Sequence, residues 1–449
     1  MSGRPLKLVM ATGWYPPFDI GGTEVYLEGL VGELSRLGAQ CTVLTPRNAR
    51  APARYEHNGV KVETYPVDDK PTAEEMRAGS PHRGFDFFRE TLARLSGSVY
   101  HQHSWTRGCG PNHLRAAREL GFQTALTVHV PGPICLRGTM MRFGAEACDG
   151  LIDEATCGAC WAHGRGAPRC VARALAKLPE RLARCGRRID GRWATAASAR
   201  SLAADKSRDL RDAFDNSDRV IAVCQWLHEA LALNGAPTDK LALSRQGLSA
   251  EYLGAARAAA EARNAGDATL RLIYLGRWDR VKGIDVIVAA VRSLPLDTRV
   301  RLTLHTVAPT RDADYEAEVR ELAAGDPRIV FAAALPREQI VPALIAHDVL
   351  VAPSRCLETG PLVVLEAQAA GLFVLGSRLG GIAELVDETE SGQLVEAGDI
   401  AQWARAIARL AAARSQGPLP RAKRQVRSQS DVAADMVEIY RKFELRRDR

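Results

Sequence analysis

The sequence predicts an α/β protein built from two Rossmann-like units, each with a parallel sheet covered by helices. At 449 residues and 46% apolar composition, the chain is long enough to bury more than one core. Short apolar runs, typical of buried parallel strands, alternate with helical patterns in both halves of the chain. The alternation stops near residue 131 and restarts near residue 270. Two sheets with an interruption in the first are therefore expected.

The first unit opens with a strand at 6–12 (LKLVMAT), a helix from Thr23 to about Leu37, and a strand at 41–46 (CTVLTP). Further strands are expected at VKVETY, SVYHQH and TALTVHV, with helices at FFRETLARL and PNHLRAAREL. This order predicts a doubly wound parallel sheet. The first domain is predicted to span 1–250.

The stretch 131–212 carries many arginines and no strand signal, and five of the ten cysteines fall between 135 and 170, so it is predicted to be an insertion that ends before SDRVIAVCQWLHEAL. An alanine-rich stretch, 255–268, follows as a helical or flexible connector. The second domain is predicted to span 251–430. Residues 431–449 are predicted to form a helix that packs back on the first domain.

The second unit repeats the alternation. Strands are expected at LRLIYLG, RVRLTLHT, RIVFAAA, DVLVAPS and FVLGS, with helices starting near Gly283, Asp314, Pro336 and Pro361. The two sheets are expected to face each other across a cleft, because open α/β sheets bind ligands at the carboxyl ends of their strands.

The segment SRCLETGPLVVLEAQAAG (354–371) predicts a loop followed by a short helix, with Pro361 at its first position and Gly371 as its stop. A helix N-terminus behind a glycine-bearing loop favours phosphate. Glu366, on the helix, could then accept hydrogen bonds from a ribose, and Glu358, in the loop, could reach beyond the phosphate. The alternative is two ordinary surface carboxylates.

Two cations follow the first strand of the second unit, in YLGRWDRVKGID. Arg277 and Lys282 could clamp a diphosphate, arginine through its fork and lysine as a point charge. Both are expected to be exposed. Taken singly, each could also be an ordinary surface cation.

Three motifs together resemble the family 4 retaining glycosyltransferases, which have the GT-B fold: GG-x-E from Gly21, G-R-x4-K-G from Gly276, and E-x7-E from Glu358. The resemblance covers most of the chain and excludes 131–212. It implies a hexosyltransferase that takes a sugar from a nucleotide diphosphate sugar with retention of configuration. Rival interpretations are a sugar-nucleotide epimerase of the same fold and a metal-binding nucleic-acid or regulatory protein.

The resemblance also implies residue roles. Arg277 and Lys282 would bind the diphosphate, Glu366 the ribose, and Glu358 the sugar hydroxyls near the anomeric carbon. His129 resembles the histidine placed against the donor sugar, although Val130 stands where many members have aspartate, and a purely structural buried histidine is the alternative. The implied catalytic residues are Glu358, His129, Arg277 and Lys282. The implied donor-binding residues are Gly21, Gly22, Arg277, Lys282, Gly360, Leu362 and Glu366.

The chemistry expected of such a site is stabilisation of the leaving diphosphate by cations and a helix N-terminus. No catalytic metal is expected. Same-face attack, in which the leaving phosphate oxygen takes the acceptor proton, is favoured over a nucleophile and acid pair of carboxylates.

The cysteines of the insertion are spaced C-x12-C-x8-C-x2-C at Cys135, Cys148, Cys157 and Cys160. A C-x2-C pair can chelate one ion around a tight turn. A structural zinc, an iron-sulfur cluster and unliganded or redox thiols all remain open. Any metal is expected to hold the insertion in place and to take no part in transfer.

A basic helix is predicted over 173–188, where Arg173, Lys177, Arg181, Arg184 and Arg188 recur at helical spacing beside leucines. It could lie on an anionic membrane and bring a lipid-linked acceptor to the site. An ordinary helix that packs its leucines on the body is the alternative.

The net charge of +7 suits anionic substrates or membrane surfaces without requiring nucleic acid. The sequence shows no signal peptide and no membrane span, so a cytoplasmic protein is expected, with peripheral contact at the inner face of the membrane. The expected partners are a nucleotide-sugar donor and a glycan, lipid-linked or small-molecule acceptor, as in polysaccharide biosynthesis.

Overall fold

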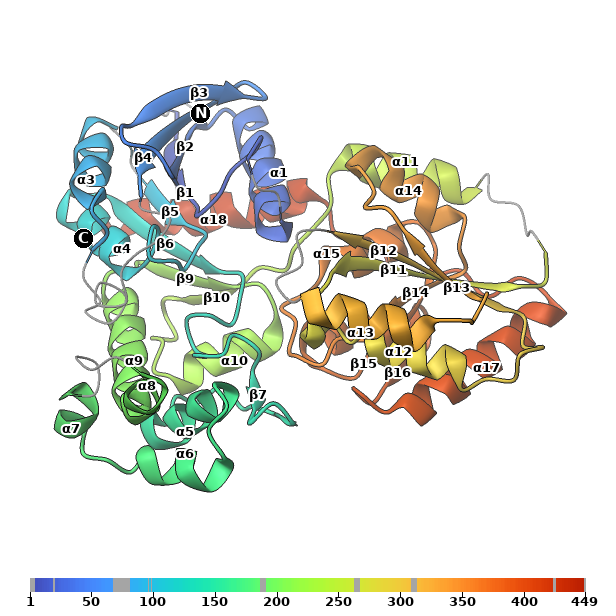
Figure 1. The fold of residues 1–449 in the computed structure, drawn as a ribbon. Coiled ribbons are helices and arrows are strands. Elements are labelled where there is room, and N and C mark those ends of the chain that lie inside the picture. Colours follow the sequence, from blue (N-terminus) through green and yellow to red (C-terminus); the bar gives the residue numbers. More distant parts are fainter. Residues whose placement is uncertain are drawn as a thin grey trace. The chain divides into compact units, whose positions relative to one another are not determined.

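The computed structural model describes residues 5–18, 21–67, 81–95, 97, 99–185, 191–261, 267–307, 313–422 and 425–447. The chain divides into two compact units (Figure 1). The first contains Met1–Arg245 together with Gln429–Arg449, and the second contains Gln246–Ser428.

The first unit is built on an eight-stranded sheet in the order β10-β9-β6-β5-β1-β2-β4-β3. Its strands are β1 Lys7–Ala11, β2 Gln40–Arg47, β3 Ala53–His57, β4 Val60–Pro66, β5 Val99–Gln102, β6 Gln123–Val128, β9 Arg219–Ala222 and β10 Leu241–Leu243. Neighbours pair in parallel except β3 and β4, which are antiparallel. The edge strand β3 was not predicted, because its sequence ARYEH has no apolar run.

The helices of this unit outside the insertion are α1 Gly22–Arg36, α3 Phe85–Arg94, α4 Pro111–Glu119, α10 Gln225–Leu233 and α18 Gln429–Arg447. The last of these, α18, returns from the end of the chain to pack against α1. Met436 and Tyr440 of α18 share one core cluster with Tyr26 and Leu30 of α1. The first unit is therefore completed by residues far away in the sequence.

The insertion folds mainly into helices. Its elements are the two-residue strands β7 Met141–Arg142 and β8 Glu146–Ala147 and the helices α5 Glu154–Gly164, α6 Arg169–Leu175, α7 Glu180–Cys185, α8 Arg192–Ala197 and α9 Ala199–Asp215. Its buried cluster consists of alanines, with partly buried Phe143, Trp161 and Leu175 packed against it. A core of such small side chains buries little apolar area, so other interactions must help to hold this segment.

The prediction of one basic helix over 173–188 was wrong. Helix α6 ends at Leu175 and α7 begins at Glu180, directly after Pro179. Proline lacks the backbone N–H that a continuous helix needs, and it restricts the residue before it to non-helical conformations. Arg188 lies outside the described residues. Arg184 forms ion pairs with Glu180 and with Asp205 of α9.

The second unit has a six-stranded, fully parallel sheet in the order β13-β12-β11-β14-β15-β16. Its strands are β11 Leu270–Arg277, β12 Val300–Val307, β13 Ile329–Ala332, β14 Val349–Ala352, β15 Phe373–Ser377 and β16 Gly392–Val395. Its helices are α11 Ala250–Glu261, α12 Ile284–Arg292, α13 Ala313–Ala323, α14 Arg337–Ile345, α15 Leu362–Ala369, α16 Gly380–Leu385 and α17 Ile400–Gln416. The predicted connector begins within α11, and residues 262–266 lie outside the described residues.

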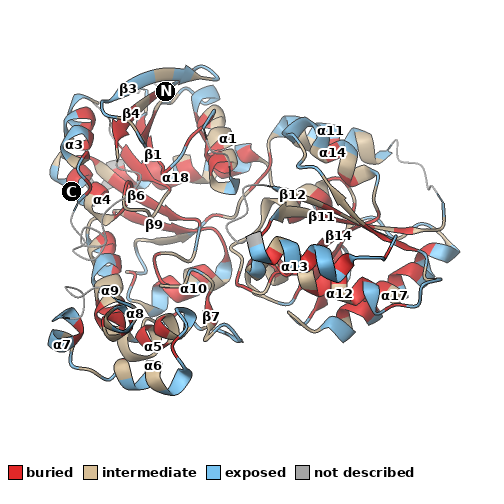
Figure 2. Cartoon of the chain, viewed as in Figure 1, coloured by how far each residue is buried: buried red, intermediate tan, exposed pale blue. Residues whose placement is uncertain are grey.

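The two faces of this second sheet carry separate cores. One cluster joins the sheet to α12, α13 and α17, and the other joins it to α11, α14, α15 and α16. Figure 2 shows the buried strands between helices whose outer faces are exposed. Over the described ranges, no helix combines the length and apolar character needed to cross a membrane.

Candidate functional site

The candidate site lies where the strand order of the second sheet reverses. Strands β11 and β14 are neighbours in the sheet. After β11 the chain continues into α12 on one face of the sheet, and after β14 it continues into α15 on the other face. Ligands of open α/β sheets bind at such a switch point, outside the carboxyl ends of the strands. Arg277 is the last residue of β11 and Lys282 follows this strand, while Ser354 and Glu358 follow β14. The fold therefore brings together residues that are 76 positions apart in the chain.

Lys282 and Glu358 form a direct ion pair. The ammonium Nζ lies 2.6 Å from the carboxylate Oε1, and the Ser354 hydroxyl donates to the same oxygen at 2.8 Å. Burial alone would raise the pKa of Glu358, but the Lys282 charge and these hydrogen bonds outweigh burial and lower it. Burial opposes the charge on Lys282, but the Glu358 carboxylate outweighs it and raises the pKa of the ammonium. Both groups are therefore charged at neutral pH.

The expectation that both cations are exposed holds only for Arg277, which lies at the end of β11. The side chain of Lys282 is 21% exposed, because Glu358 and the loop after β14 cover it. The charge of Arg277 also helps to lower the pKa of Glu358. Two cations and one carboxylate thus share the same end of the sheet.

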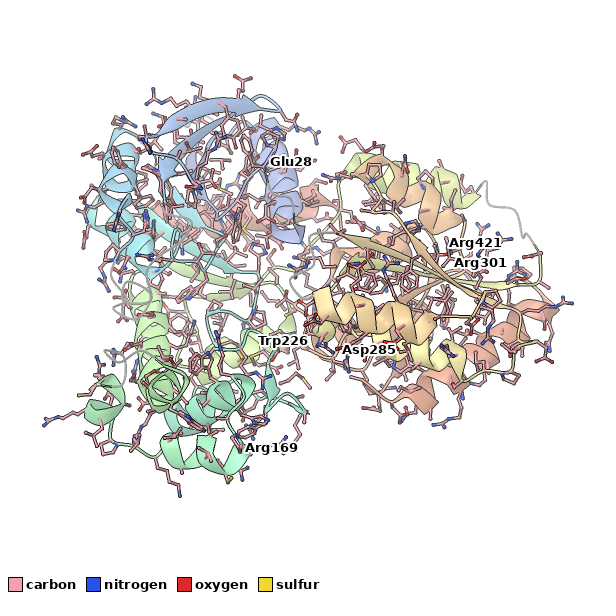
Figure 3. The ribbon with its side chains drawn as sticks, in the orientation of Figure 1. Glu28, Arg169, Trp226, Asp285, Arg301 and Arg421 are labelled. Carbon is pink, nitrogen blue, oxygen red and sulfur yellow. The ribbon has the colours of Figure 1, made fainter. Side chains whose placement is uncertain are left out.

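The turn that carries Lys282 is fixed by Gly283, which has a left-handed φ of 68°. A side chain here would place its Cβ 2.1 Å from the carbonyl oxygen of Pro353. Arg355 adds two further ties, since its backbone N–H donates to Val281 O at 2.6 Å and its guanidinium pairs with Asp285. Asp285 lies at the start of α12 and is labelled in Figure 3. The turn after β11 and the loop after β14 are therefore locked together.

The loop carrying Glu358 rests on two further glycines. Gly381 donates its N–H to the Glu358 carbonyl at 2.6 Å, and a Cβ at Gly381 would lie 2.4 Å from the nitrogen of Gly360. Gly360 itself has a φ of 117°, so its backbone also requires glycine. Pro361 precedes α15 as its N-cap, instead of occupying the first helical position, and Leu362 begins the helix. The start of α15 has no side-chain cap among the described residues, which suits an anionic ligand.

Glu366 lies on α15, one turn from its start. Burial raises the pKa of Glu366 to about 7, and the nearby Arg337 offsets only part of this effect. The ring of Tyr252 lies close to this carboxylate. Two side-chain oxygens, the Tyr252 hydroxyl and Gln246 Oε1, are buried and have no hydrogen-bond partner among the described residues. The amide oxygen of Gln246 lies beside Gly360.

Gln246 and Tyr252 were not predicted as site residues. They belong to QGLSAEY, which leads into α11. The QGLS segment also resembles the family, but it does not contain Tyr252 and it indicated no role for Gln246.

The remaining predicted site residues belong to the first unit. Gly21 and Gly22 lie at the start of α1, where the Gly21 N–H donates to Glu24 Oε2 at 2.9 Å. Residues 19–20 of the predicted loop lie outside the described residues. His129 follows β6 and is buried, with its Nε2 3.1 Å from His103 Nδ1. Burial lowers the pKa of His129 to about 3, so the imidazole is neutral.

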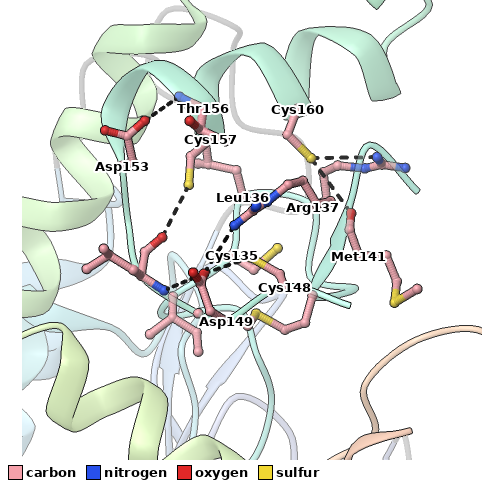
Figure 4. Close-up of a pocket in the computed structure, with 15 residues that line it drawn as sticks. Cys135, Leu136, Arg137, Met141, Cys148, Asp149, Asp153, Thr156, Cys157 and Cys160 are labelled. Carbon is pink, nitrogen blue, oxygen red and sulfur yellow. Dashed lines mark hydrogen bonds and ion pairs between the residues drawn. The ribbon is translucent and has the colours of Figure 1, made fainter. Parts of the chain in front are cut away.

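The four predicted metal ligands border one pocket of the insertion, shown in Figure 4. Three of the thiols are directed to oxygen atoms: Cys148 to Asp149 Oδ1 at 3.6 Å, Cys157 to Leu151 O at 3.9 Å, and Cys160 to Met141 O at 3.7 Å. Within the described ranges, no three His, Cys, Asp or Glu side chains are arranged to hold a metal. The predicted site is therefore not formed by these side chains as they stand, because the thiols hydrogen-bond to oxygens instead of converging.

The sequence matches two families of known proteins. Residues 21–247 match the glycosyl transferase 4-like domain, and residues 269–413 match the glycosyl transferases group 1. Similar curated proteins include D-inositol 3-phosphate glycosyltransferase from Acidothermus cellulolyticus, 34% identical over 31% of this chain and 33% of that protein. Amylovoran biosynthesis glycosyltransferase AmsK from Erwinia amylovora is 27% identical over 47% of this chain and 52% of that protein. The chain thus spans about a third to a half of the length of these relatives.

Solved structures share the fold over nearly the whole chain. Sucrose-phosphate synthase from Thermosynechococcus elongatus has a TM-score of 0.62 at 19% identity, covering 98% of this chain and 99% of that one. HepE from Anabaena, in complex with UDP-glucose, has a TM-score of 0.58 at 14% identity, covering 97% and 100%. The predicted fold class is confirmed: two parallel-sheet, Rossmann-like units of the GT-B fold. With its first family match covering half of its residues, the chain belongs to the family 4, or group 1, glycosyltransferases.

Proposed function

We propose that this protein is a retaining glycosyltransferase that moves a hexose from a nucleotide diphosphate sugar to an acceptor. The observation that carries the proposal is the group of charges at the switch point of the second sheet. There, Arg277 and Lys282 act on Glu358, in the loop that leads into α15, while Glu366 lies one turn along this helix. This arrangement suits a diphosphate followed by a ribose.

In the proposed reaction, the two cations stabilise the charge that develops on the leaving diphosphate. Arg277 is exposed and can form a fork with two phosphate oxygens, whereas Lys282 contributes a point charge held in place by Glu358. Glu358 is ionised and can accept hydrogen bonds from hydroxyls of the donor sugar near the anomeric carbon. Glu366 accepts from the ribose, and Gly360 and Leu362 line the phosphate end.

Retention follows in this proposal from same-face attack. The acceptor hydroxyl bonds to the anomeric carbon, the bond to the diphosphate breaks, and the leaving phosphate oxygen takes the hydroxyl proton. His129 is proposed to contact the donor sugar as a neutral imidazole, in keeping with its lowered pKa. Gly21 and Gly22 are proposed to form the loop that closes over the donor. No metal is required for this chemistry.

UDP-sugars are the first donors to test, because HepE from Anabaena shares the fold and its structure contains UDP-glucose. The proposed acceptor is a glycan, a lipid-linked glycan or a small molecule. The AmsK relative is named for the biosynthesis of a polysaccharide, amylovoran, which supports a glycan acceptor.

The proposed compartment is the cytoplasm. The ten cysteines are all free thiols in the part of the chain that the structure describes, which suits a reducing environment. Peripheral contact with an anionic membrane is proposed through the exposed cations of α6 and α7, such as Arg173 and Arg181, and no longer through a continuous helix.

A structural metal in the four-cysteine pocket is also part of the proposal. Cys157 and Cys160 lie on α5, Cys135 and Cys148 precede it, and all four border the same pocket, which supports a shared ion once the thiols leave their oxygen partners. The ion would hold the insertion, whose alanine core is small.

The test of the proposed function is a donor and acceptor panel. The full chain is incubated with UDP-, ADP- and GDP-hexoses, with and without candidate glycan acceptors, and release of nucleotide diphosphate is measured. A glycosyltransferase releases it in proportion to acceptor, and the product linkage, determined by NMR, retains the anomeric configuration of the donor. Interconversion of the donor sugar without an acceptor would instead identify an epimerase.

A further inference from the structure

Three histidines lie at one edge of the first sheet, where the neighbouring strands β5 and β6 end. His101 belongs to β5, His103 comes directly after β5, and His129 comes directly after β6. All three side chains are buried. His103 and His129 form a direct pair, since His103 Nδ1 lies 3.1 Å from His129 Nε2 and the two rings stack with their centroids 5.4 Å apart.

The ring of His129 is held from a second direction by Tyr26 of α1. The centroids of these two rings lie 4.7 Å apart in an edge-to-face arrangement. The orientation of the His129 imidazole is thus fixed by contacts within the first unit. Because its Nε2 is directed to His103, the proposed contact with the donor sugar must be made by Nδ1.

His101 shows how a structural histidine is accommodated at this edge. Its Nδ1 lies 2.5 Å from the Tyr440 hydroxyl and its Nε2 lies 2.7 Å from Thr127 Oγ1, so both nitrogens have partners within the core. In His103 only Nδ1 is bonded, and Nε2 is buried with no hydrogen-bond partner among the described residues. A buried polar atom in this state costs free energy, which indicates that His103 is present for more than packing.

The unpartnered nitrogen of His103 also indicates where the protons of the pair lie. Burial keeps both imidazoles neutral, since it lowers the pKa of His129 to about 3 and the pKa of His103 well below its usual value. One proton therefore lies between His103 Nδ1 and His129 Nε2. If His129 held this proton, His103 would carry its own proton on Nε2, as a buried N–H without a partner in the described part of the chain.

In the other arrangement His103 Nδ1 holds the shared proton, and its Nε2 is only a bare acceptor. Unpaired buried N–H groups are rarer than unpaired acceptors, so this second arrangement is favoured. The hydrogen bond at one ring nitrogen determines which nitrogen of a neutral histidine is protonated. The proton of His129 is then on Nδ1, the nitrogen assigned above to the donor sugar.

We propose that His103 is a positioning residue of the transferase site. Its Nδ1–H donates to His129 Nε2, which fixes the tautomer of His129 and lets His129 Nδ1–H donate to a hydroxyl oxygen of the donor sugar. His103 itself does not touch the substrate. This inference rests on the proposed contact between His129 and the donor sugar, and it adds the residue that orients this contact and the ring nitrogen that makes it.

The tautomer is measured by ¹⁵N NMR of the full chain, labelled in its histidine rings. A His129→Gln variant identifies the signals of His129. The expected result is a protonated Nδ1 and a bare Nε2 in His129. In His103→Phe, which keeps a ring but has no N–H to donate, the Nε2 signal should change. A proton on His129 Nε2 in the parent protein would overturn the proposal.

Kinetics separate positioning from folding. His103→Phe is expected to lower kcat by roughly 10- to 100-fold, the effect of a small misplacement in an active site, with little change in the KM for the donor. His103→Asn should keep most of the parental kcat, because its side-chain amide can donate from nearly the position of Nδ1. Binding of a bare nucleotide diphosphate, assigned to Arg277, Lys282 and Glu366, should not change.

The matched control is His82→Phe. His82 also belongs to a buried histidine pair, since its Nε2 lies 3.0 Å from His113 Nε2, but it stacks on Tyr65 of β4. Loss of this pair should lower the melting temperature, as in His103→Phe, and should leave kcat at the parental value.

Two kinetic results would contradict the role of His103: a parental kcat in His103→Phe, or a kcat of His103→Asn as low as that of His103→Phe. A parent protein that transfers no sugar would instead overturn the function on which the proposal rests. The tautomer of His129 is measured without substrate, so it distinguishes these two failures.

Discussion

At the scale of single residues, the pairing of Lys282 with Glu358 changes what each is expected to do. A diphosphate that approaches Lys282 meets an ammonium already paired with a carboxylate at 2.6 Å. Arg277 has no ion pair among the described residues and is exposed, so it is the cation most accessible to phosphate. The two cations should therefore differ in what their removal affects.

Arg277→Ala and Lys282→Ala are each expected to raise the barrier to transfer by on the order of 2–4 kcal/mol, because each removes a cation from the leaving group. The two should differ in stability. Arg277→Ala should melt like the parent, whereas Lys282→Ala leaves the Glu358 carboxylate without its main partner and should lower the melting temperature. Steady-state kinetics and thermal melts check both statements. Parental turnover by both variants would exclude the clamp.

Glu358→Gln is expected to separate binding from transfer. The substitution releases Lys282 from its ion pair while conserving shape, so a bare nucleotide diphosphate should bind at least as tightly as to the parent. Transfer should fall roughly 100-fold or more, since a charged acceptor facing the sugar is lost. Calorimetry and kinetics on the same preparation decide this. A large loss of nucleotide affinity would show that Glu358 supports the diphosphate and not the sugar.

Glu366 should make nucleotide binding depend on pH. Its pKa is raised to about 7, and the carboxylate accepts hydrogen bonds from ribose hydroxyls more strongly than the protonated carboxyl does, so affinity should increase between pH 6 and pH 8. Because folding raises this pKa from 4.5, the folded state favours the protonated carboxyl over the carboxylate. The contribution of Glu366 to the free energy of unfolding is therefore present below pH 4.5 and is lost as the pH rises through 7. Calorimetry across this range should show the increase, and Glu366→Gln, weaker at every pH, should show none.

At the scale of elements, the site depends on how tightly the segments after β11 and β14 approach each other. Gly283 allows this approach, because a side chain there would collide with the carbonyl oxygen of Pro353. Gly381 plays the same part between α16 and the loop after β14, since its Cβ would collide with the backbone of Glu358 and Gly360. Pro353, which Gly283 contacts, is directly followed by Ser354, a partner of Glu358. A disturbance of this turn should therefore reach the carboxylate.

Gly283→Ala is expected to reduce both stability and nucleotide binding. The left-handed backbone alone disfavours alanine by about 1–3 kcal/mol, and the Cβ also requires Pro353 to move. Gly254→Ala is the matched control, because Gly254 lies in α11 with no atom within 4 Å of an added Cβ. In the control, the free energy of unfolding should increase by about 0.5–1 kcal/mol, because alanine replaces glycine inside a helix. Chemical denaturation measures the free energy of unfolding of both variants. Equal stabilities of Gly283→Ala and Gly254→Ala would contradict the strain at Gly283.

Apolar runs and helix signals predicted most strands and helices of both sheets, because buried parallel strands and glycine or proline boundaries leave local patterns. They did not predict β3, whose polar residues lie at a sheet edge, nor the break between α6 and α7. The sequence predicted those site residues that come directly after strands, because the carboxyl ends of parallel strands meet at one edge of the sheet. The sequence did not predict the ion pair between Lys282 and Glu358, nor the positions of Gln246 and Tyr252. These features depend on packing between segments that are distant in the chain.

At the scale of the whole molecule, the two units differ in continuity. The second is one continuous stretch, Gln246–Ser428, with a core on each face of its sheet. The first requires Gln429–Arg449 in addition to Met1–Arg245. The proposed nucleotide contacts at Arg277, Lys282 and Glu366 all belong to the continuous unit.

A protein containing residues 246–428 alone is therefore expected to fold and to bind a bare nucleotide diphosphate with an affinity within roughly tenfold of the full chain, a difference of about 1.4 kcal/mol. It should not transfer sugar, because His129 and the proposed donor loop belong to the other unit. A cooperative thermal transition and calorimetry test this. Nucleotide binding that appears only in the full chain would show that the first unit contributes directly to that affinity.

Helix α18 also sets an order of events during synthesis. Met436 and Tyr440 of α18, which share the core with Tyr26 and Leu30, are translated only after the entire second unit. The Tyr440 hydroxyl, which lies 2.5 Å from His101 Nδ1, arrives equally late. The nascent first unit must therefore wait with part of its apolar surface exposed while the ribosome makes nearly two hundred further residues, about 10–40 seconds at typical elongation rates. Premature termination before residue 429 would leave a complete second unit attached to an unfinished first one. Such products are natural substrates for chaperones and proteases, so cells would accumulate mainly chains that have been read to their end.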